Sequence, residues 1–405
     1  MINACVIGLS GRGCESLLKN ILLHNRDINV IAVCDVYQDR IDNALKLISE
    51  SGGSAKGFTD YKEALNQKGI DAAFVFTSWE THTEIAIYAM EKGIAVASEV
   101  GCEYSIENCL NLVKTQEKTG TPYMFMENCC FGKDELFVTS MVRRGLFGEI
   151  VHCSGAYGHD LRKEISYGIQ NRHYRFKNYL YRNLDNYPTH ELGPIAKVLN
   201  INRGNKILTV SSVASKSAGL KEYIKTLPDA TEKMKNADFK QGDIVTTTIT
   251  CAGGETITLR LDTTLPRTYG REFTVRGTKG MYTQNTNSVF LDGDEELFNC
   301  IEYYKKNIDN ATKYYDEYLP EIWKNVTPEE LEAGHGGMDC FAYKAFSDAL
   351  KNKTDMPIDV YDGATWMAVS VLSEMSIACG GAPQAMPDFT NGKWFHRKPL
   401  DVCQL

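Results

Sequence analysis

The chain has 405 residues, of which 43% are hydrophobic and 24% charged, so we expect a globular protein of two domains with a large core. Its net charge of −8, without any basic run, argues against nucleic acid as the main partner. No apolar stretch reaches membrane-spanning length, and no secretory signal is seen. The thirteen cysteines lack paired zinc spacings, which predicts reduced thiols, no metal and a cytoplasmic location.

Residues 1–128 alternate between short apolar strands and helical stretches. We expect strands at 3–7, 30–34, 57–58, 71–76, 95–98 and 123–126, and helices at 14–24, 41–51, 61–67, 81–92 and 105–119. This alternation predicts a doubly wound parallel sheet, which is the Rossmann type of α/β domain.

A glycine-rich turn with the spacing G-x-x-G-x-G lies between the first strand and the first helix. Backbone N–H groups and the helix dipole at such a turn can hold a pyrophosphate. An acidic residue, Asp35, ends the next strand and would accept hydrogen bonds from the ribose hydroxyls of NAD, while repelling the 2′-phosphate of NADP. The predicted cofactor contacts here are Gly8, Ser10, Gly11, Arg12, Gly13 and Asp35. The alternative is a plain turn with a capping aspartate.

Further candidate cofactor residues follow the later strands of this domain. The carboxyl ends of strands in an open sheet form its ligand crevice. Trp79, His82, Glu99, Val100 and Asn128 lie at or just after such ends, so we expect them to line the cofactor. For His82 the alternative is a structural place in the first turn of a helix that Thr81 caps.

Residues 129–405 predict an α+β domain that binds substrate and supports self-association. Strands are expected at 150–158, 207–215, 243–251, 255–262, 272–276 and 280–283, the last four forming two hairpins around glycines. Together they predict a largely antiparallel sheet with one open face, which makes a homo-oligomer the expected state. Helices are expected at 133–143, 294–330, 336–351 and 362–377, and residues 162–186, poor in aliphatic side chains, are expected to form a loop at a polar site.

The segment from Asn186 to Gly204, NYPTHELGPIAKVLNINRG, predicts a helix that begins near its Tyr-Pro-Thr-His sequence. A helix start offers unpaired N–H groups and a positive dipole end. Tyr187 and His190, three residues apart, share one side of a turn and can aim a phenol and a base at one small polar ligand. The alternative is a Tyr-Pro turn that Thr189 caps, with His190 merely packed.

Taken together, these motifs resemble the glucose-fructose oxidoreductase / inositol dehydrogenase group (Gfo/Idh/MocA) and, within it, the NAD-dependent glycosidases of glycoside hydrolase family 109, of the alpha-N-acetylgalactosaminidase type. The resemblance covers nearly the whole chain. It is carried by Gly11–Gly13, Cys34–Val36, Trp79 with His82, Ser98–Val100, Glu127–Asn128, Tyr157 with His159–Arg162, Tyr187–His190, Leu192–Pro194, Asn200–Gly204, Gly277–Gly280 and His335–Asp339.

The resemblance implies a cycle in which NAD is not consumed. The sugar is oxidised at C3, loses its C2 proton and its C1 leaving group, adds water, and is reduced again. It implies His190 as the base at the C3 oxygen, with Tyr187 contacting substrate or sharing in proton transfer. Tyr157 and His159 are candidates for the C2 base, while His335 is expected to be structural. The implied substrate contacts are Arg175, Tyr187, Pro188, Thr189, His190 and Tyr269. The alternative for Arg175 is a residue that only forms a salt bridge, and for Tyr269 a packed tyrosine of a turn.

Two departures bear on this prediction. Dehydrogenases of the larger group usually carry Glu-Lys-Pro after the fourth strand, whereas this chain has Glu99–Val100–Gly101, which agrees with the glycosidase branch. The residue after His190 is Glu191 where the best-known glycosidases have glycine, which puts the sugar in question. Two alternatives remain: an NAD-dependent sugar or cyclitol dehydrogenase, and a non-catalytic NAD-dependent sugar sensor.

Overall fold

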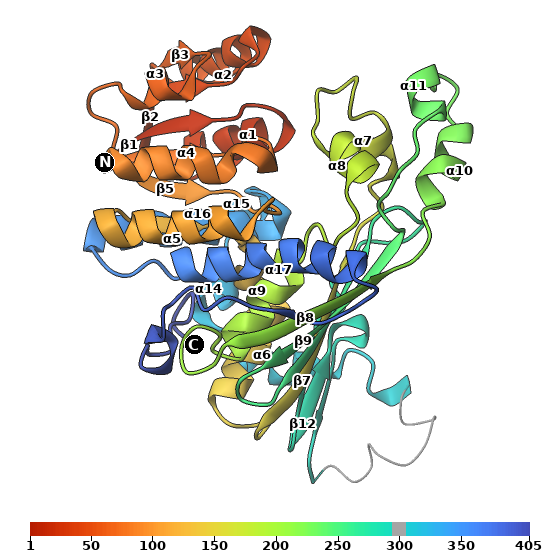
Figure 1. Cartoon of the computed structure of the whole chain (residues 1–405). Helices are drawn as coiled ribbons and strands as arrows, with labels where there is room; N and C mark the ends of the chain where they lie inside the picture. The colour runs from red at the N-terminus through yellow and green to blue at the C-terminus, as the bar shows by residue number, and fades with distance from the viewer. Residues whose placement is uncertain (294–304) are drawn as a thin grey trace. The chain divides into compact units, whose positions relative to one another are not determined.

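The computed structural model, which describes residues 1–293 and 305–405, divides into two compact units (Figure 1). The first comprises Met1–Gly132, Glu321–Thr365 and Leu400–Gln404, and the second Lys133–Pro320 and Trp366–Pro399 with Leu405. Sequence patterns suggested one boundary, at 128/129. The first unit therefore includes two segments from late in the chain. The division into an NAD-binding and a substrate-binding domain stays a prediction.

The first unit contains a six-stranded sheet in the order β3-β2-β1-β4-β5-β6, with every pair parallel. Its strands are β1 (Ile2–Ile7), β2 (Ile28–Cys34), β3 (Lys56–Phe58), β4 (Ala72–Val75), β5 (Ala95–Ser98) and β6 (Tyr123–Phe125). Every residue of β4 and β5 is buried, as expected of parallel strands covered on both faces. The predicted Rossmann-type sheet is confirmed, and its strand order brings the ends of β1, β2 and β4 side by side.

Helices connect these strands and cover the sheet. They are α1 (Gly11–Glu15), the π-helix η1 (Ser16–Leu22), α2 (Gln38–Glu50), α3 (Tyr61–Leu65), α4 (Trp79–Glu91), α5 (Ile106–Thr119) and η2 (Asn128–Phe131), followed late in the chain by α14 (Glu321–Lys324), α15 (Pro328–Glu332), η6 (His335–Gly337) and α16 (Met338–Asn352). On β4, Phe74 stacks with Tyr343 of α16 (ring centroids 5.5 Å apart) and meets Phe346 edge-on. Aromatic packing thus fixes α16 on this sheet.

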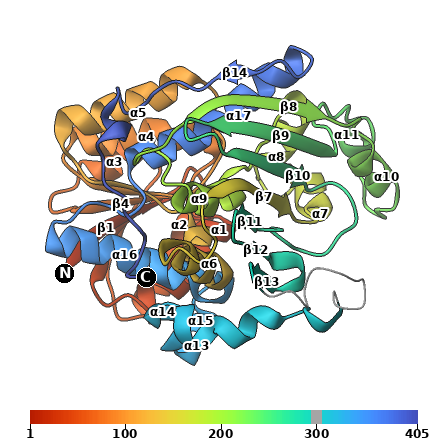
Figure 2. The same cartoon turned by 90° about the horizontal axis from the view of Figure 1, so that it is seen from below.

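The second unit is built on an eight-stranded sheet in the order β13-β12-β11-β7-β10-β9-β8-β14 (Figure 2). Its strands are β7 (Ile150–Gly158), β8 (Ile207–Ala214), β9 (Ile244–Cys251), β10 (Thr256–Asp262), β11 (Thr274–Gly277), β12 (Gly280–Thr283), β13 (Ser288–Leu291) and β14 (Gln384–Ala385). Both predicted hairpins are present, β9 with β10 and β11 with β12, and the β7–β10 pair is parallel. The expectation of a largely antiparallel sheet is confirmed.

The helices of this unit are α6 (Lys133–Arg143), α7 (Arg162–Ser166), α8 (Arg175–Tyr181), α9 (Thr189–Val198), α10 (Gly219–Lys225), α11 (Glu232–Lys235), η3 (Gln284–Thr286), η5 (Asn310–Tyr314), α13 (Tyr315–Tyr318) and η7 (Lys393–Phe395), while α17 (Val360–Ala378) contains the boundary at 365/366. Short helices also occupy parts of 305–330, as expected, while 294–304 of that predicted helical stretch lie outside the described residues.

The prediction of a loop at 162–186 is wrong, because helices α7 and α8 lie within this segment. Phe176 and Tyr179, three residues apart, are both buried and anchor α8 by one face. The helix was not predicted because its sequence has few aliphatic residues. Aromatic side chains form its buried face instead. Among the helices of the described segments, none combines the length and hydrophobicity needed to cross a bilayer.

Candidate active site

At Gly8 and Gly13 the glycine turn of the first unit lies too close to its neighbours for any side chain. A Cβ on Gly8 would lie 2.5 Å from the carbonyl carbon of Phe76, and Gly8 itself has φ +91°. A Cβ on Gly13 would lie 1.9 Å from the carbonyl oxygen of Gly8. Gly11, by contrast, faces open space and begins α1, after Ser10 in the N-cap position. The turn therefore leaves backbone accessible at the helix start, as a pyrophosphate requires.

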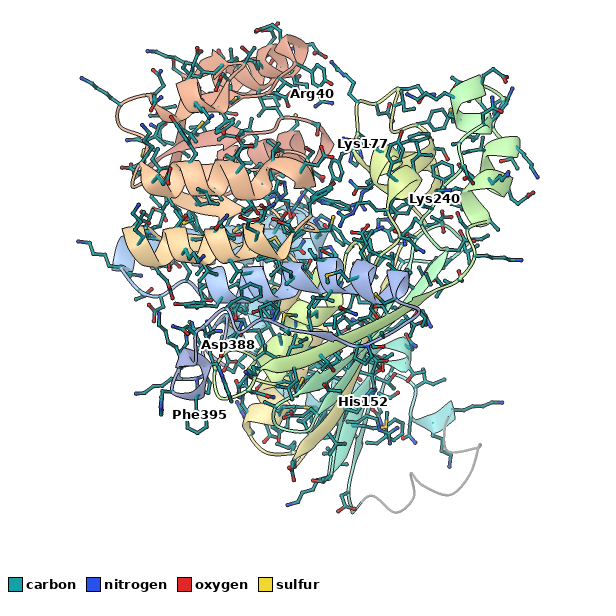
Figure 3. All side chains as sticks on the ribbon, in the orientation of Figure 1. Arg40, His152, Lys177, Lys240, Asp388 and Phe395 are labelled. Carbon is teal, nitrogen blue, oxygen red and sulfur yellow. The ribbon has the colours of Figure 1, made fainter. Side chains whose placement is uncertain are left out.

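Asp35 ties the end of β2 to this turn. Its Oδ2 accepts a hydrogen bond from the backbone N–H of Leu9 (2.8 Å), and its Oδ1 accepts one from Tyr37 (3.0 Å). Arg40, labelled in Figure 3, lies 3.6 Å from the same carboxylate. A glycine turn with no steric room for side chains at Gly8 and Gly13, followed by a carboxylate at the end of the second strand, fits the adenosine half of NAD.

Trp79 and Val100, predicted to line the cofactor, are both 2% exposed. A Cβ on Gly101 would lie 2.4 Å from Cδ1 of Trp79, so the indole packs directly on that glycine. This contact supplies a physical reason for glycine, rather than proline, at position 101. The cofactor role of Trp79 and Val100 stays a prediction.

His82 is buried in the first turn of α4. Its Nε2 lies 2.9 Å from the carbonyl oxygen of Thr77, and burial lowers the pKa of the imidazole below its ordinary value. A neutral imidazole that donates from Nε2 to this carbonyl fixes the start of the helix. That contact supports the structural alternative for His82.

Asp339 gathers several of the predicted cofactor residues around one carboxylate. Arg12 binds it in two-point fashion, Nη1 to Oδ2 at 2.6 Å and Nη2 to Oδ1 at 3.0 Å. Asn128 donates from Nδ2 to Oδ1 at 2.7 Å, and His335 Nδ1 lies 2.9 Å from Oδ2. Nε of Arg12 donates to Oε2 of Glu99 at 2.7 Å, so its guanidinium joins two carboxylates.

The charges in this cluster shift one another's protonation. Burial alone raises the pKa of Asp339, but Arg12 and His335 outweigh burial and hold that pKa well below its usual range. The hydrogen bond to Asp339 raises the pKa of His335 above its ordinary value. Sequence reasoning grouped His335 and Asp339 only as one motif of the resemblance, because nothing in their spacing indicates a contact with Arg12.

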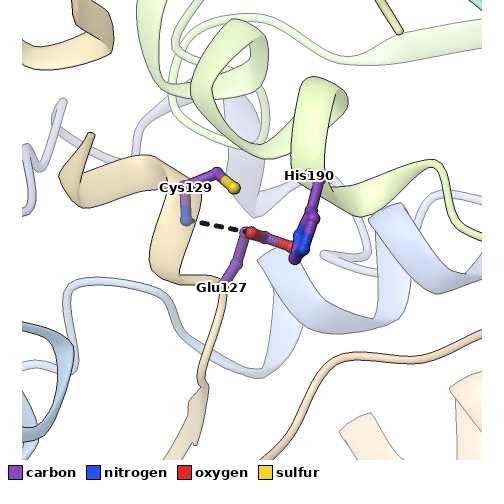
Figure 4. Close-up of side chains that lie close together, drawn as sticks. All are labelled: Glu127, Cys129 and His190. Atoms are coloured by element: carbon purple, nitrogen blue, oxygen red, sulfur yellow. Dashed lines mark hydrogen bonds between the residues drawn. The ribbon is translucent and has the colours of Figure 1, made fainter. Parts of the chain in front are cut away.

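Glu127, which precedes Asn128 after β6, is fully buried. Its Oε1 accepts a hydrogen bond from the backbone N–H of Cys129 at 3.0 Å and so caps the short helix η2 (Figure 4). Of the cysteines in the described residues, all are free thiols and most are buried. This agrees with the expectation of reduced cysteines.

In the second unit, α9 approaches β7 very closely. A Cβ on Gly155 would lie 2.6 Å from Cβ of Glu191, so a side chain at Gly155 would push the helix away. Pro188 occupies the N-cap position and no side chain caps the helix there, so Thr189 does not have the capping role that the alternative interpretation gave it. The beginning of α9, with His190 in its first turn, thereby comes to lie over the strand that carries Tyr157 (His190 is drawn in Figure 4).

Tyr157, Tyr187 and His190 form one aromatic cluster. The ring centroids of Tyr157 and Tyr187 lie 4.5 Å apart, those of Tyr187 and His190 4.7 Å, and those of Tyr157 and His190 5.3 Å. All three are at most 8% exposed. The structure therefore brings Tyr157 to the pair of Tyr187 and His190, which lie 30 and 33 residues further along the chain.

The other predicted substrate residues of this unit border the same cluster. The guanidinium carbon of Arg175 lies 5.1 Å from the ring centroid of Tyr187, and its Nε pairs with Oε1 of Glu164 at 2.7 Å. His159 Nδ1 lies 3.2 Å from the Tyr157 hydroxyl, and its ring meets that of Tyr269 edge-on at 5.2 Å. Tyr269 is 50% exposed and forms the solvent side of the cluster.

Burial sets the protonation states of these groups. It raises the pKa of the Tyr157 phenol well above its usual range, although Arg175 partly opposes this shift. Burial and the nearby charge of Arg175 lower the pKa of His159, so its imidazole is neutral at neutral pH. Asp185 lies two residues before Tyr187, and burial raises the pKa of its carboxyl group to about 7. Sequence reasoning missed both Glu164 and Asp185, because isolated acidic residues carry no spacing signal.

The chain matches two protein families in succession. Residues 2–126 match the oxidoreductase family with an NAD-binding Rossmann fold, and residues 131–396 match the C-terminal domain of glycosyl hydrolase 109. A glycosyl hydrolase family 109 protein of Stenotrophomonas maltophilia is 38% identical over 98% of this chain and 91% of its own length. An alpha-N-acetylgalactosaminidase of Tannerella forsythia is 35% identical over 96% of this chain and 86% of its own.

Solved structures share the fold at low identity. Levoglucosan dehydrogenase in complex with NADH and levoglucosan is 16% identical, with a TM-score of 0.70 over 96% of this chain and 100% of that one. The scyllo-inositol dehydrogenase of Lactobacillus casei with bound NAD(H) and scyllo-inositol is 15% identical, with a TM-score of 0.65 over 95% and 99%. The fold, the cofactor domain and the relatives agree: this chain belongs to glycosyl hydrolase family 109 and carries the NAD-binding domain of the Gfo/Idh/MocA oxidoreductases.

Proposed function

We propose that this protein is an NAD-dependent glycosidase that cleaves N-acetylgalactosaminides or closely related glycosides. The observation that carries the proposal is the buried cluster of Tyr157, Tyr187 and His190, in a chain of glycosyl hydrolase family 109. The cluster consists of two phenols and one imidazole, which can transfer protons, and it does not contain the two carboxylates that most glycosidases use. Hydrolysis through such groups is consistent with an elimination route rather than with attack by a carboxylate.

NAD, when bound, supplies the hydride acceptor and later the hydride donor at C3 of the sugar. His190 takes the proton of the C3 hydroxyl and gives it back in the last step. Once C3 is a ketone, the C2 proton is acidic, and Tyr157 stands as the group that receives it. Tyr187 donates to an oxygen on which negative charge develops. Arg175 and Tyr269, with Pro188 and Thr189, bind the sugar.

The cofactor contacts are proposed for the first unit. Backbone at Gly8, Ser10, Gly11 and Gly13 faces the pyrophosphate, and Asp35 faces the adenine ribose. Arg12, Glu99 and Asn128 act as a group that Asp339 holds together. Trp79, His82 and Val100 are buried residues that we assign to the wall of the same cofactor site.

The test is release of nitrophenol from alpha- and beta-linked nitrophenyl sugars, with deuterium exchange at C2 followed by NMR, for wild type and His190→Ala. We expect cleavage with C2 exchange in the wild type and loss of both in the variant. His152→Ala is the matched control, since His152 lies on β7 with its Nδ1 2.8 Å from Thr256 Oγ1. Steady NADH production from a free sugar without cleavage of any glycoside would replace the proposal with a sugar dehydrogenase. Neither reaction, with NAD bound, would indicate a sensor.

We further propose that the protein works in the cytoplasm as a homo-oligomer that acts on small molecules. Leu208 and Val213 on β8 are large apolar side chains that are 41% and 57% exposed, and Val213 follows directly after the buried Ser212 and so lies on the opposite face of the sheet. Exposed apolar residues on a sheet face favour association with a second copy. Light scattering of wild type and Val213→Lys tests this, and a wild-type mass of 45.3 kDa would contradict it.

A further inference from the structure

We propose that His159 is the terminal proton acceptor behind Tyr157, so that the two residues remove the C2 proton as one relay. This inference rests on the proposed glycosidase function and assigns the C2 base within it. His159 would act through Tyr157, which makes it a positioning and relay residue rather than one that contacts the sugar.

The geometry links the two side chains directly. Tyr157 is the penultimate residue of β7, and His159 follows two residues later, directly after the strand, so both side chains leave the chain on the same side. The Tyr157 hydroxyl and Nδ1 of His159 lie 3.2 Å apart, within hydrogen-bond distance, and the two rings meet edge-on. Among the described residues, the Tyr157 hydroxyl forms this side-chain hydrogen bond and no other. His159 is therefore the side chain that can accept the phenol proton.

Solvent access distinguishes the two ends of this pair. Tyr157 is 4% exposed and is packed against Tyr187 and His190. His159 is only partly buried and contacts Tyr269, which is half exposed. A proton that reaches the imidazole can therefore exchange with water, whereas a proton held on Tyr157 alone would stay in a dry site.

The charges around His159 suit an acceptor that is neutral at rest. Arg175 and His190 disfavour a resting positive charge on it, and burial acts in the same direction. Glu164 and Asp160 favour the charged form, and Asp160 is itself paired with Arg162 at 2.6 Å. The imidazole can thus accept a proton transiently, while Tyr157 stays a neutral phenol between turnovers.

The step conserves protons and electron pairs. The C2–H bond breaks as an O–H bond forms on Tyr157, while the original phenol proton passes to Nδ1 of His159. The electron pair of C2–H moves into the bond to C1 as the C1 leaving group departs. In the return half, the oxygen of a water molecule bonds to C1 and one of its protons goes to the departed leaving group, while His159 gives its proton back through Tyr157 to C2. Both residues finish the cycle as they began it.

The test compares His159→Ala and His159→Gln with wild type, using 4-nitrophenyl N-acetyl-alpha-galactosaminide and adding imidazole and its methyl derivatives. Loss of a general base lowers kcat by about 100-fold. We expect such a loss in both variants, with loss of C2 deuterium exchange. Imidazole should restore at least part of the activity of His159→Ala, and more strongly as the pKa of the added base rises. His152→Ala, on the same strand, should behave like wild type with and without imidazole.

The glutamine variant separates a relay from a structural hydrogen bond. Its amide oxygen can accept from the Tyr157 hydroxyl but cannot take up a proton. Full activity of His159→Gln would overturn the proposal, as would a folded, NAD-binding His159→Ala that imidazole does not restore. These results leave the glycosidase function of the wild type untouched. If the wild type itself cleaves no glycoside, the proposed function fails first, and the relay fails with it.

Discussion

Arg12 and Asp339 lie 327 positions apart in the chain and form a two-point ion pair in the first unit. Asp339 is fully buried, and the side chain of Arg12 is 26% exposed. Because Arg12 stands in the glycine turn, the pair joins the proposed pyrophosphate site to helix α16. Arg12 therefore holds the turn in place through its ion pair with Asp339, and its guanidinium group is not free to bind phosphate alone.

Replacing Asp339 by asparagine should weaken both the fold and NAD binding. The amide keeps the shape but leaves Arg12 with one carboxylate partner, and breaking a buried ion pair costs about 3–5 kcal/mol. If the turn is loosened, the affinity for NAD should fall by about tenfold, which corresponds to about 1.4 kcal/mol. Thermal unfolding and calorimetric titration with NAD measure the two effects.

The matched control for this prediction is Asp348→Asn on the same helix, where no ion pair is recorded and the side chain is only partly buried. It should change neither quantity. A destabilised Asp339→Asn protein that binds NAD with wild-type affinity would contradict the link between the ion pair and the cofactor.

His335 should make the stability of the protein depend on pH. Asp339 raises the pKa of this imidazole in the folded state, so its stabilising contribution is complete below the unfolded pKa of about 6.5 and is lost as pH rises through the folded pKa. His335→Gln should therefore lower Tm more at pH 5.5 than at pH 9. Equal Tm differences at both values would show that the imidazole is neutral throughout.

The first sheet could be predicted from the sequence because its strands are short apolar runs between glycines and helix caps. The hairpins of the second sheet were equally evident from Gly253–Gly254 and Gly277–Gly280. Tyr187 and His190 could be grouped because residues three apart share a helical turn, and Tyr157 and His159 because alternate residues share a strand face.

The contacts between distant segments could not be predicted in the same way. Nothing local links Arg12 to Asp339, nor Arg175 to Glu164, since each pair meets only after the chain has folded. The return of residues 321–365 to the first unit had no compositional signal either, and Phe74 with its aromatic partners on α16 explains it only in retrospect.

Asp35 should determine which dinucleotide binds. Its carboxylate faces the glycine turn and would repel a 2′-phosphate, while Arg40 lies 3.6 Å away and could pair with one. Asp35→Ser should therefore lower the preference for NAD over NADP by roughly tenfold or more. Fluorescence titration with both dinucleotides measures the ratio. In the double variant Asp35→Ser/Arg40→Ala the gain in NADP binding should disappear, and its persistence would contradict the role given to Arg40.

Gly101 should tolerate no side chain while Trp79 keeps its place. A Cβ at Gly101 would lie 2.4 Å from the indole, and overpacking of this kind costs about 1–3 kcal/mol. Gly101→Ala should therefore lower the free energy of unfolding, which denaturant titration measures. Gly270→Ala is the control, because its Cβ would meet only one atom, at 3.7 Å. A Gly101→Ala/Trp79→Phe double variant should recover part of the loss if the indole is the cause.

Asp185 should make folding less favourable as pH rises toward neutrality. It is fully buried, accepts a hydrogen bond from Thr247 Oγ1 at 2.9 Å, and has its pKa raised by burial to about 7, whereas an unfolded aspartate titrates near 3.9. A raised folded pKa means that stability is greatest below the unfolded value and declines up to about pH 7, by at most about 4 kcal/mol.

Asp185→Asn removes that titration while keeping an acceptor for Thr247. Relative to wild type, the variant should gain stability as pH rises from 4 to 7, which unfolding in urea at several pH values would show. Asp316→Asn, on a half-exposed helix of the same unit, should leave the wild-type profile unchanged. Parallel profiles for wild type and Asp185→Asn would mean that the Asp185 carboxyl is charged in the folded protein. Tyr187, whose backbone N–H faces that carboxyl, would then begin the proposed active-site segment beside a fixed negative charge.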